Sequence, residues 1–144
     1  MVFNPDVIYK RLEKMREDVK YLMTYKDMPL EDFKRNFEHF KTAERCLEIA
    51  IECSIDIANH IISREDFKRP DRYENVFGVL AEHGIIASDF AETLKGMARF
   101  RNLLVHEYLE IRLDRVHEKI QKNLGDFDRF AKDIVSYLEK KEMQ

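Results

Sequence analysis

Apolar residues recur every three or four positions through most of this chain, a spacing that places them on one face of an α-helix. The clearest run is Ile8, Leu12, Met15, Val19 and Leu22. Only four glycines and three prolines occur among 144 residues, so little of the chain suits hairpins or long loops. The sequence therefore predicts an all-α fold.

Short connections between amphipathic helices make neighbouring helices antiparallel, so we expect an up-and-down bundle of about five helices. Asn4 and Pro5 suit the start of the first helix, and Gly84 suits the end of the third. Gly125 is interpreted as a weak point inside the last helix and not as its end. The helices are expected at about 4–25, 30–63, 72–83, from 88 to near 105, and 113–140.

The length favours a single domain spanning 1–144, with a heavily ionised surface because 37% of the residues are charged. The formal net charge of −3 argues against extensive coating of duplex nucleic acid, which normally needs a strongly basic surface. No apolar run is long enough for a membrane span, and the first residues lack the apolar region of a signal peptide. We therefore expect a cytoplasmic protein with no membrane contact.

The cysteine and glycine patterns argue against a metal site and against a nucleotide cofactor. Cys46 and Cys53 lie seven residues apart in one expected helix. Their Cα atoms would be about 10 Å apart, too far for a disulfide, so both are expected to be reduced packing residues. No CxxC pair, GxGxxG segment or Walker loop occurs, and His39, His83 and His117 lie in separate elements. The sequence thus predicts neither a metal nor a cofactor.

One segment, RFRNLLVHEYLEI at residues 99–111, concentrates polar and titratable side chains around a short apolar run. On an ideal helix Arg101 and His106 project about 140° apart, so one straight helix cannot bring both to one site. Either the helix ends near Val105 and the chain turns His106 back, or the two side chains meet from two copies of the chain. Both alternatives place a cation and an imidazole close to a seam.

An arginine and a histidine in one cleft are suited to metal-free RNA cleavage. The guanidinium binds a phosphate through a planar fork of donors and stabilises the extra charge of a pentacoordinate phosphorane. The imidazole can remove a proton from a ribose 2′-hydroxyl or return one to the leaving oxygen. Asn102 is a candidate to orient the phosphate or the imidazole, and Tyr108 is a candidate to hydrogen-bond or to stack on a base.

A structural alternative stands beside the catalytic interpretation. Basic residues are common near the C-terminus of a helix because they complement its dipole. On that view Arg101 and His106 carry no chemistry, and both are replaceable without loss of function.

The segment RNLLVHEY resembles the signature of HEPN-domain proteins: an arginine, a polar residue, three further positions, a histidine, one residue and a tyrosine. Arg101, Asn102, His106 and Tyr108 occupy these positions. The wider chain is similar, in order, to the toxin subunit of HEPN/MNT toxin–antitoxin pairs in four segments. They are AIECSIDIANHII, VFGVLAEHGII, MARFRNLLVHEY and DFDRFAKDIVSYL, within about Val7 to Leu138.

This resemblance implies a homodimer whose motifs face each other across a two-fold axis and form one RNA-cleaving cleft. It also implies an antitoxin, a minimal nucleotidyltransferase that in several such pairs adds AMP to the motif tyrosine, here Tyr108. The residue after the motif histidine is often glycine in such proteins and is Glu107 here. A carboxylate at that position could tune His106 or repel RNA.

Several acidic residues share one face of the second expected helix, among them Glu48, Glu52 and Asp56. A solvated face accounts for this spacing. The alternative is that Asp56 reaches Arg101 or His106 and orients it, as its place in the segment SIDIANH suggests.

The sequence as a whole predicts a metal-independent endoribonuclease toxin that cleaves RNA by 2′-hydroxyl attack in a composite site at a dimer interface. Arg101 and His106 are its expected catalytic residues, with support from Asn102, Asp56 and Tyr108. The alternative is a non-catalytic helical subunit that docks the nucleotidyltransferase and presents Tyr108 to it. A plain helical scaffold is the third possibility.

Overall fold

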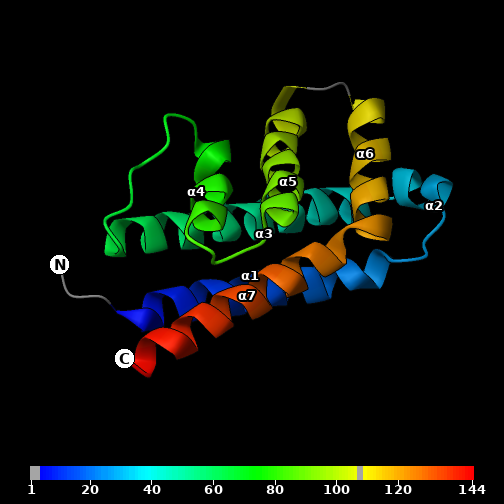
Figure 1. Cartoon of the computed structure of the whole chain (residues 1–144). Helices are drawn as coiled ribbons and strands as arrows, with labels where there is room; N and C mark the ends of the chain where they lie inside the picture. The colour runs from blue at the N-terminus through cyan, green and yellow to red at the C-terminus, as the bar shows by residue number, and fades with distance from the viewer. Residues whose placement is uncertain (1–3, 107–108) are drawn as a thin grey trace.

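The computed structural model describes residues 4–106 and 109–144, so Glu107 and Tyr108 of the predicted motif lie outside the described residues. The described residues form seven α-helices and two short 3-10 helices with no strand, which confirms the all-α prediction (Figure 1). The expected count of five was too low. The α-helices are α1 (Pro5–Leu22), α2 (Leu30–Arg35), α3 (Phe37–Arg64), α4 (Val76–Glu82), α5 (Ser88–His106), α6 (Leu109–Lys122) and α7 (Leu124–Glu142), and the 3-10 helices are η1 (Met23–Tyr25) and η2 (Tyr73–Asn75).

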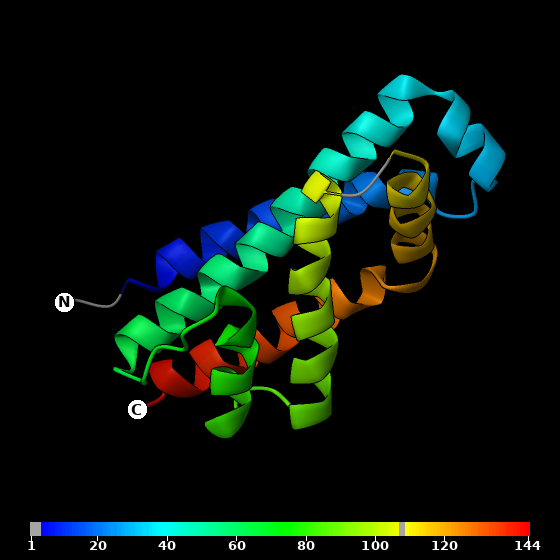
Figure 2. The ribbon, with the colours of Figure 1, turned by 90° about the horizontal axis from the view of Figure 1, so that it is seen from above.

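The helices form two sets that cross each other. Figure 1 shows α1, α3 and α7 running along the length of the molecule, with α3 antiparallel to α1. Helices α4, α5 and α6 cross α3 at a steep angle (Figures 1 and 2). Helices α4 and α5 also meet α7, where the rings of Phe77 and Phe130 lie 5.7 Å apart and Arg129 lies over Phe90. The up-and-down arrangement therefore holds for neighbouring pairs such as α5 and α6, whereas the whole chain is not one simple bundle.

The second helix was expected to run unbroken from residue 30 to 63, but it is interrupted at Asn36. Asn36 is extended, with φ −104° and ψ 106°, and its side chain accepts a hydrogen bond of 3.1 Å from the backbone N–H of His39. Asparagine competes with the helix backbone in this way, so it caps α3 and separates it from α2. Phe37 follows the break and is 64% exposed.

The last helix was expected to be continuous over 113–140 and is instead two helices. α6 begins earlier, at Leu109, and ends at Lys122, while α7 begins at Leu124. The break falls on Asn123, with φ −121° and ψ 2°, and Gly125 lies in the first turn of α7. Because the chain turns at Asn123, α6 stands on α3 while α7 returns along α1 (Figure 1).

The expected end of the third helix is confirmed, and its start is later than expected. Gly84 has φ +75°, the left-handed conformation that glycine adopts without strain, and Ile85 donates its N–H to the carbonyl of Leu80 at 3.0 Å. Residues 73–75 form η2, so the α-helical part begins only at Val76.

Helix α3 is the centre of the core and packs against α1, α4, α5, α6 and α7. Fully buried Leu47, Ile51, Ile57 and Ile61 line its length. Each such side chain stabilises the fold by about 1.5–3 kcal/mol through burial of its apolar surface. Cys46 and Cys53 are also buried on α3 and form no disulfide. Burial is the main cause that raises the pKa of the Cys46 thiol to about 11.

No helix in the described part of the chain combines the length and the apolar character that crossing a membrane requires.

Candidate active site

Helix α5 carries the predicted catalytic pair and is continuous through His106. The helix ends at His106, next to the expected end near Val105, but His106 is still helical and is not turned back as the first alternative required. Arg101 lies on the inward side of α5, among Leu94, Met97 and Leu104, which are buried. His106 is exposed at the end of the helix. Within one chain the two side chains project in different directions.

The guanidinium of Arg101 is held by two neighbours from different elements. Its Nε lies 3.7 Å from Oε1 of Glu52 on α3, and the exposed fractions of the two side chains are 40% and 37%. Its Cζ lies 5.6 Å from the ring centroid of Tyr73 on η2, within the range of a cation–π interaction. Arg101 thus has an acidic neighbour on α3 and an aromatic neighbour on η2, while its side chain keeps 40% exposure.

Tyr73 is itself fixed against α5. Its hydroxyl donates to the backbone carbonyl of Ala98 at 3.3 Å. The next residue, Glu74, is buried and its carboxylate lies 3.3 Å from Arg99 and 3.6 Å from Arg72. These contacts tie η2 to α5 and hold the aromatic ring beside Arg101.

Asp56 does not make the contact that its sequence position suggested. Its carboxylate lies 3.6 Å from Nε of Arg11 on α1, and the side chain is exposed. Asp56 and Glu52 share a face of α3 but lie one turn apart along it, and at these two levels Asp56 meets Arg11 on α1 while Glu52 meets Arg101 on α5. The acidic partner of Arg101 is thus Glu52. Glu48, one turn before Glu52, pairs instead with Arg45 at 2.8 Å.

Asn102 and His106 lie one helical turn apart on the solvent side of α5, and both are exposed. Near this end of the α5–α6 pair, three apolar side chains are exposed to solvent. They are Val105, Leu109 and Ile111, which are 72%, 47% and 44% exposed, and we call them the tip patch.

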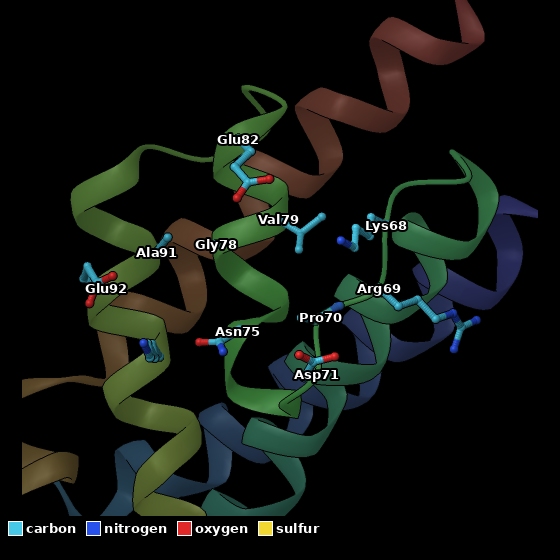
Figure 3. Close-up of a pocket in the computed structure, with 11 residues that line it drawn as sticks. Lys68, Arg69, Pro70, Asp71, Asn75, Gly78, Val79, Glu82, Ala91 and Glu92 are labelled. Atoms are coloured by element: carbon cyan, nitrogen blue, oxygen red, sulfur yellow. The ribbon is translucent and has the colours of Figure 1, made fainter.

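A cavity of about 440 Å³ lies away from this site, between residues 68–71, α4 and the first half of α5 (Figure 3). Neither Arg101 nor His106 lines it. Its charged lining residues balance, so it offers no net attraction to a phosphate: Lys68, Arg69 and Lys95 against Asp71, Glu82 and Glu92.

Metal ligands are not grouped in the described part of the chain: no three His, Cys, Asp or Glu side chains lie together in a way that could hold an ion. His117 has a structural contact, since its Nε2 lies 2.6 Å from the backbone carbonyl of Met28. His83 stacks on Phe67, with ring centroids 3.5 Å apart.

Two residues beside Arg101 were missed by sequence reasoning. Glu52 stands on the acidic face that the sequence displayed, but the spacing on α3 did not show which carboxylate would meet α5. Tyr73 comes from a segment with no helical periodicity, and only the packing of η2 on α5 brings it to Arg101. The sequence carried no signal for it.

Comparison with known proteins places this arrangement in a family. The family model described as Ribonuclease HepT-like matches residues 9–134. The chain is 31% identical over 126 residues to the mRNA nuclease HepT of Shewanella oneidensis, across 87% of this chain and 93% of that protein. It is 30% identical over 136 residues to the tRNA nuclease HepT of Aphanizomenon flos-aquae, across 93% of this chain and 91% of that protein.

The fold agrees with these matches. The solved structure of the tri-AMPylated Shewanella oneidensis HEPN toxin in complex with MNT antitoxin superposes with a TM-score of 0.82 at 29% identity. The superposition covers 93% of this chain and 99% of the other. The resemblance to the toxin subunit of HEPN/MNT pairs, drawn from the motif and four further segments, is confirmed. The chain belongs to the HepT-like ribonuclease family.

Proposed function

We propose that this protein is an endoribonuclease toxin that cleaves RNA without a metal ion, using Arg101 and His106. The observation that carries the proposal is the setting of Arg101, a partly exposed cation whose Nε lies 3.7 Å from Glu52 on α3 and whose Cζ lies 5.6 Å from the ring centroid of Tyr73. Such a group is preorganised for a phosphate, and preorganised charge is effective in stabilising a transition state.

The proposed reaction is an internal transfer at phosphorus. The ribose 2′-oxygen attacks the adjacent phosphorus and loses its proton to an imidazole, while the 5′-oxygen of the next nucleotide leaves with a proton from a second imidazole. The products are a 2′,3′-cyclic phosphate and a 5′-hydroxyl. Arg101 neutralises the charge that builds on the phosphoryl oxygens. Asn102, exposed one turn before His106, is proposed to orient the phosphate.

The site is proposed to be completed by a second copy of the chain. Two considerations support a homodimer: Arg101 and His106 of one helix project about 140° apart, and the tip patch beside them is apolar and uncovered. A two-fold axis through this patch would bring the Arg101 of one protomer toward the His106 of its partner and would supply two imidazoles.

The proposed protein partner is a minimal nucleotidyltransferase antitoxin that transfers AMP to Tyr108. The related Shewanella oneidensis toxin is tri-AMPylated and bound to an MNT antitoxin, which supports both the partner and the modification. Tyr108 follows His106 by two residues in the sequence, so an adenylate there would add a bulky anion next to the motif histidine.

A cleavage assay with purified protein tests the proposal. Replacement of His106 by alanine is expected to reduce the rate by about 10²–10⁴-fold, because a proton-transfer group is lost. Arg101→Ala is expected to reduce it by about 10²–10³-fold. Circular dichroism checks that both variants fold, and cleavage should persist in excess EDTA and leave cyclic phosphate ends.

Two results would favour the other interpretations. A wild-type protein that leaves RNA intact, yet binds the nucleotidyltransferase and gains AMP on Tyr108, would be a docking subunit. If both alanine variants inhibit growth as strongly as the wild type, Arg101 and His106 are replaceable, and the protein is better described as a helical scaffold.

A further inference from the structure

A groove of about 400 Å³ runs between α5 and α6, which lie side by side in Figure 1. Phe100, which is buried, and Leu103 form its floor, and it is distinct from the cluster around Arg101. We call it the α5–α6 groove. Gly96 lines one end of it, and a Cβ atom built at Gly96 would meet no atom within 4 Å, so the groove is open there.

The α5–α6 groove is basic on a protein whose net charge is −3. Arg99, Arg115 and Lys119 line it against one carboxylate, Glu118. Arg99 is paired with buried Glu74. In the described part of the chain, no ion pair engages Arg115 or Lys119. Lys119 extends over the ring of Phe100, with Nζ 5.5 Å from the centroid, which holds its ammonium within the groove.

The α5–α6 groove leads to the proposed catalytic histidine. Arg99 and His106 are seven residues apart on one continuous helix, so they project within about 20° of each other and lie about 10 Å apart along the axis. Leu103 is one turn from His106 on the same side. An RNA strand whose scissile phosphate lies at His106 can therefore continue along α5 into the groove.

On α5, the tip patch and the α5–α6 groove lie on different sides of the helix. Val105 and Leu103 are two residues apart on α5, so they project about 160° from each other. The partner would cover the side of α5 that carries Val105, while the groove lies on the side that carries Leu103.

We propose that the α5–α6 groove holds the backbone of single-stranded RNA on one side of the cleavage point, with Arg115 and Lys119 as its phosphate contacts. The proposal rests on the nuclease function proposed above and extends it to substrate positioning. The size of the groove suits one strand, and the low net charge of the protein agrees with a local contact instead of duplex coating.

Salt dependence of binding tests the groove. The full-length His106→Ala protein, whose cleavage should be about 10²–10⁴-fold slower, is titrated with a short fluorescein-labelled single-stranded RNA of mixed sequence at several salt concentrations. Each lost phosphate contact should reduce the slope of log affinity against log salt by about 0.7. Arg115→Gln and Lys119→Gln are each expected to reduce this slope by about 0.7, and the double variant is expected to reduce it by about twice as much. Lys20→Gln on α1 is the matched control and should leave the slope unchanged.

A second pair of variants tests the groove without removing a cation. Gly96→Ala should bind RNA as well as the parent protein, and it should add helix stability because alanine is the better helix former. Gly96→Glu places a carboxylate in the open end of the groove and should weaken binding several-fold. Equal binding by both Gly96 variants would contradict the proposal.

The outcomes separate this proposal from the nuclease function. If the salt-dependence slopes for Arg115→Gln and Lys119→Gln equal the slope for Lys20→Gln, the proposal that the groove binds RNA is wrong. Absence of RNA binding at low salt would also show it to be wrong. Either result would hold even if the wild type cleaves RNA. Reduced slopes in a protein whose wild type cuts nothing would support the groove and refute the nuclease. Unchanged slopes together with loss of nucleotidyltransferase capture would mean that the groove binds a protein instead.

Discussion

Oε1 of Glu52 lies 3.7 Å from Nε of Arg101 and joins the centre of α3 to the motif helix α5. Both side chains are more than one-third exposed, and a pair of this kind contributes only about 0.2–1 kcal/mol to stability. We therefore expect the Glu52–Arg101 pair to orient the guanidinium and to add little to the free energy of folding.

Glu52→Gln should leave the fold intact and lower kcat several-fold with little change in KM, because Arg101 loses the charge that anchors its Nε. Glu48→Gln is the matched control, since Glu48 lies one turn earlier on α3 and pairs with Arg45. Steady-state cleavage kinetics and a urea melt measure both effects. Equal kcat values for the two variants would show that Glu52 does not position Arg101.

Tyr73 supplies a ring on which Arg101 rests, so Tyr73→Leu should reduce cleavage while Tyr73→Phe should not. The ring interaction is worth about 0.5–1 kcal/mol, which corresponds to a loss of about two- to five-fold. Phenylalanine keeps the ring and loses only the hydrogen bond to Ala98. Cleavage rates of the two variants decide the matter. If Tyr73→Phe loses as much cleavage activity as Tyr73→Leu, the hydroxyl group of Tyr73 and not its ring supports cleavage.

The sequence predicted the helical class and the motif helix because both depend on local spacing. It did not predict the breaks at Asn36 and Asn123, where a single asparagine outweighs a continuous apolar pattern on either side. The sequence also did not predict which residues contact Arg101. Asp56 and Glu52 share a face of α3 and differ by one turn along it, and the position along α3 decides which of them reaches Arg101.

Glu65 joins the end of α3 to α7 and should make stability depend on acid pH. Tyr137 donates to its carboxylate at 2.7 Å and Lys141 at 3.1 Å. Burial raises the pKa of Glu65, but these hydrogen bonds and the nearby cations outweigh burial, and the pKa lies below its ordinary value. A lowered folded-state pKa gives stability that is present above the unfolded pKa of about 4.3 and is lost as pH falls through the folded value.

We therefore expect Glu65→Gln to lower the free energy of unfolding at pH 7 by about 1.5–3 kcal/mol, the usual contribution of hydrogen bonds to a charged group. The variant should also lose less stability than the wild type between neutral pH and pH values below the folded pKa. Urea unfolding across this range measures both. Glu139→Gln, an exposed carboxylate on the same helix α7, is the control and should behave as the wild type. Parallel pH curves for Glu65→Gln and the wild type would contradict this role.

Mixing two inactive variants tests most directly whether Arg101 and His106 act from different protomers. A mixed dimer of Arg101→Ala and His106→Ala keeps one intact pair only if the arginine of one protomer works with the histidine of its partner. The mixed dimer has one arginine facing the one remaining imidazole. A composite site therefore predicts that purified mixed dimers cleave RNA more slowly than the wild type, which has two imidazoles, but faster than the His106→Ala homodimer, which has none. Mixed dimers as inactive as the His106→Ala homodimer would contradict it.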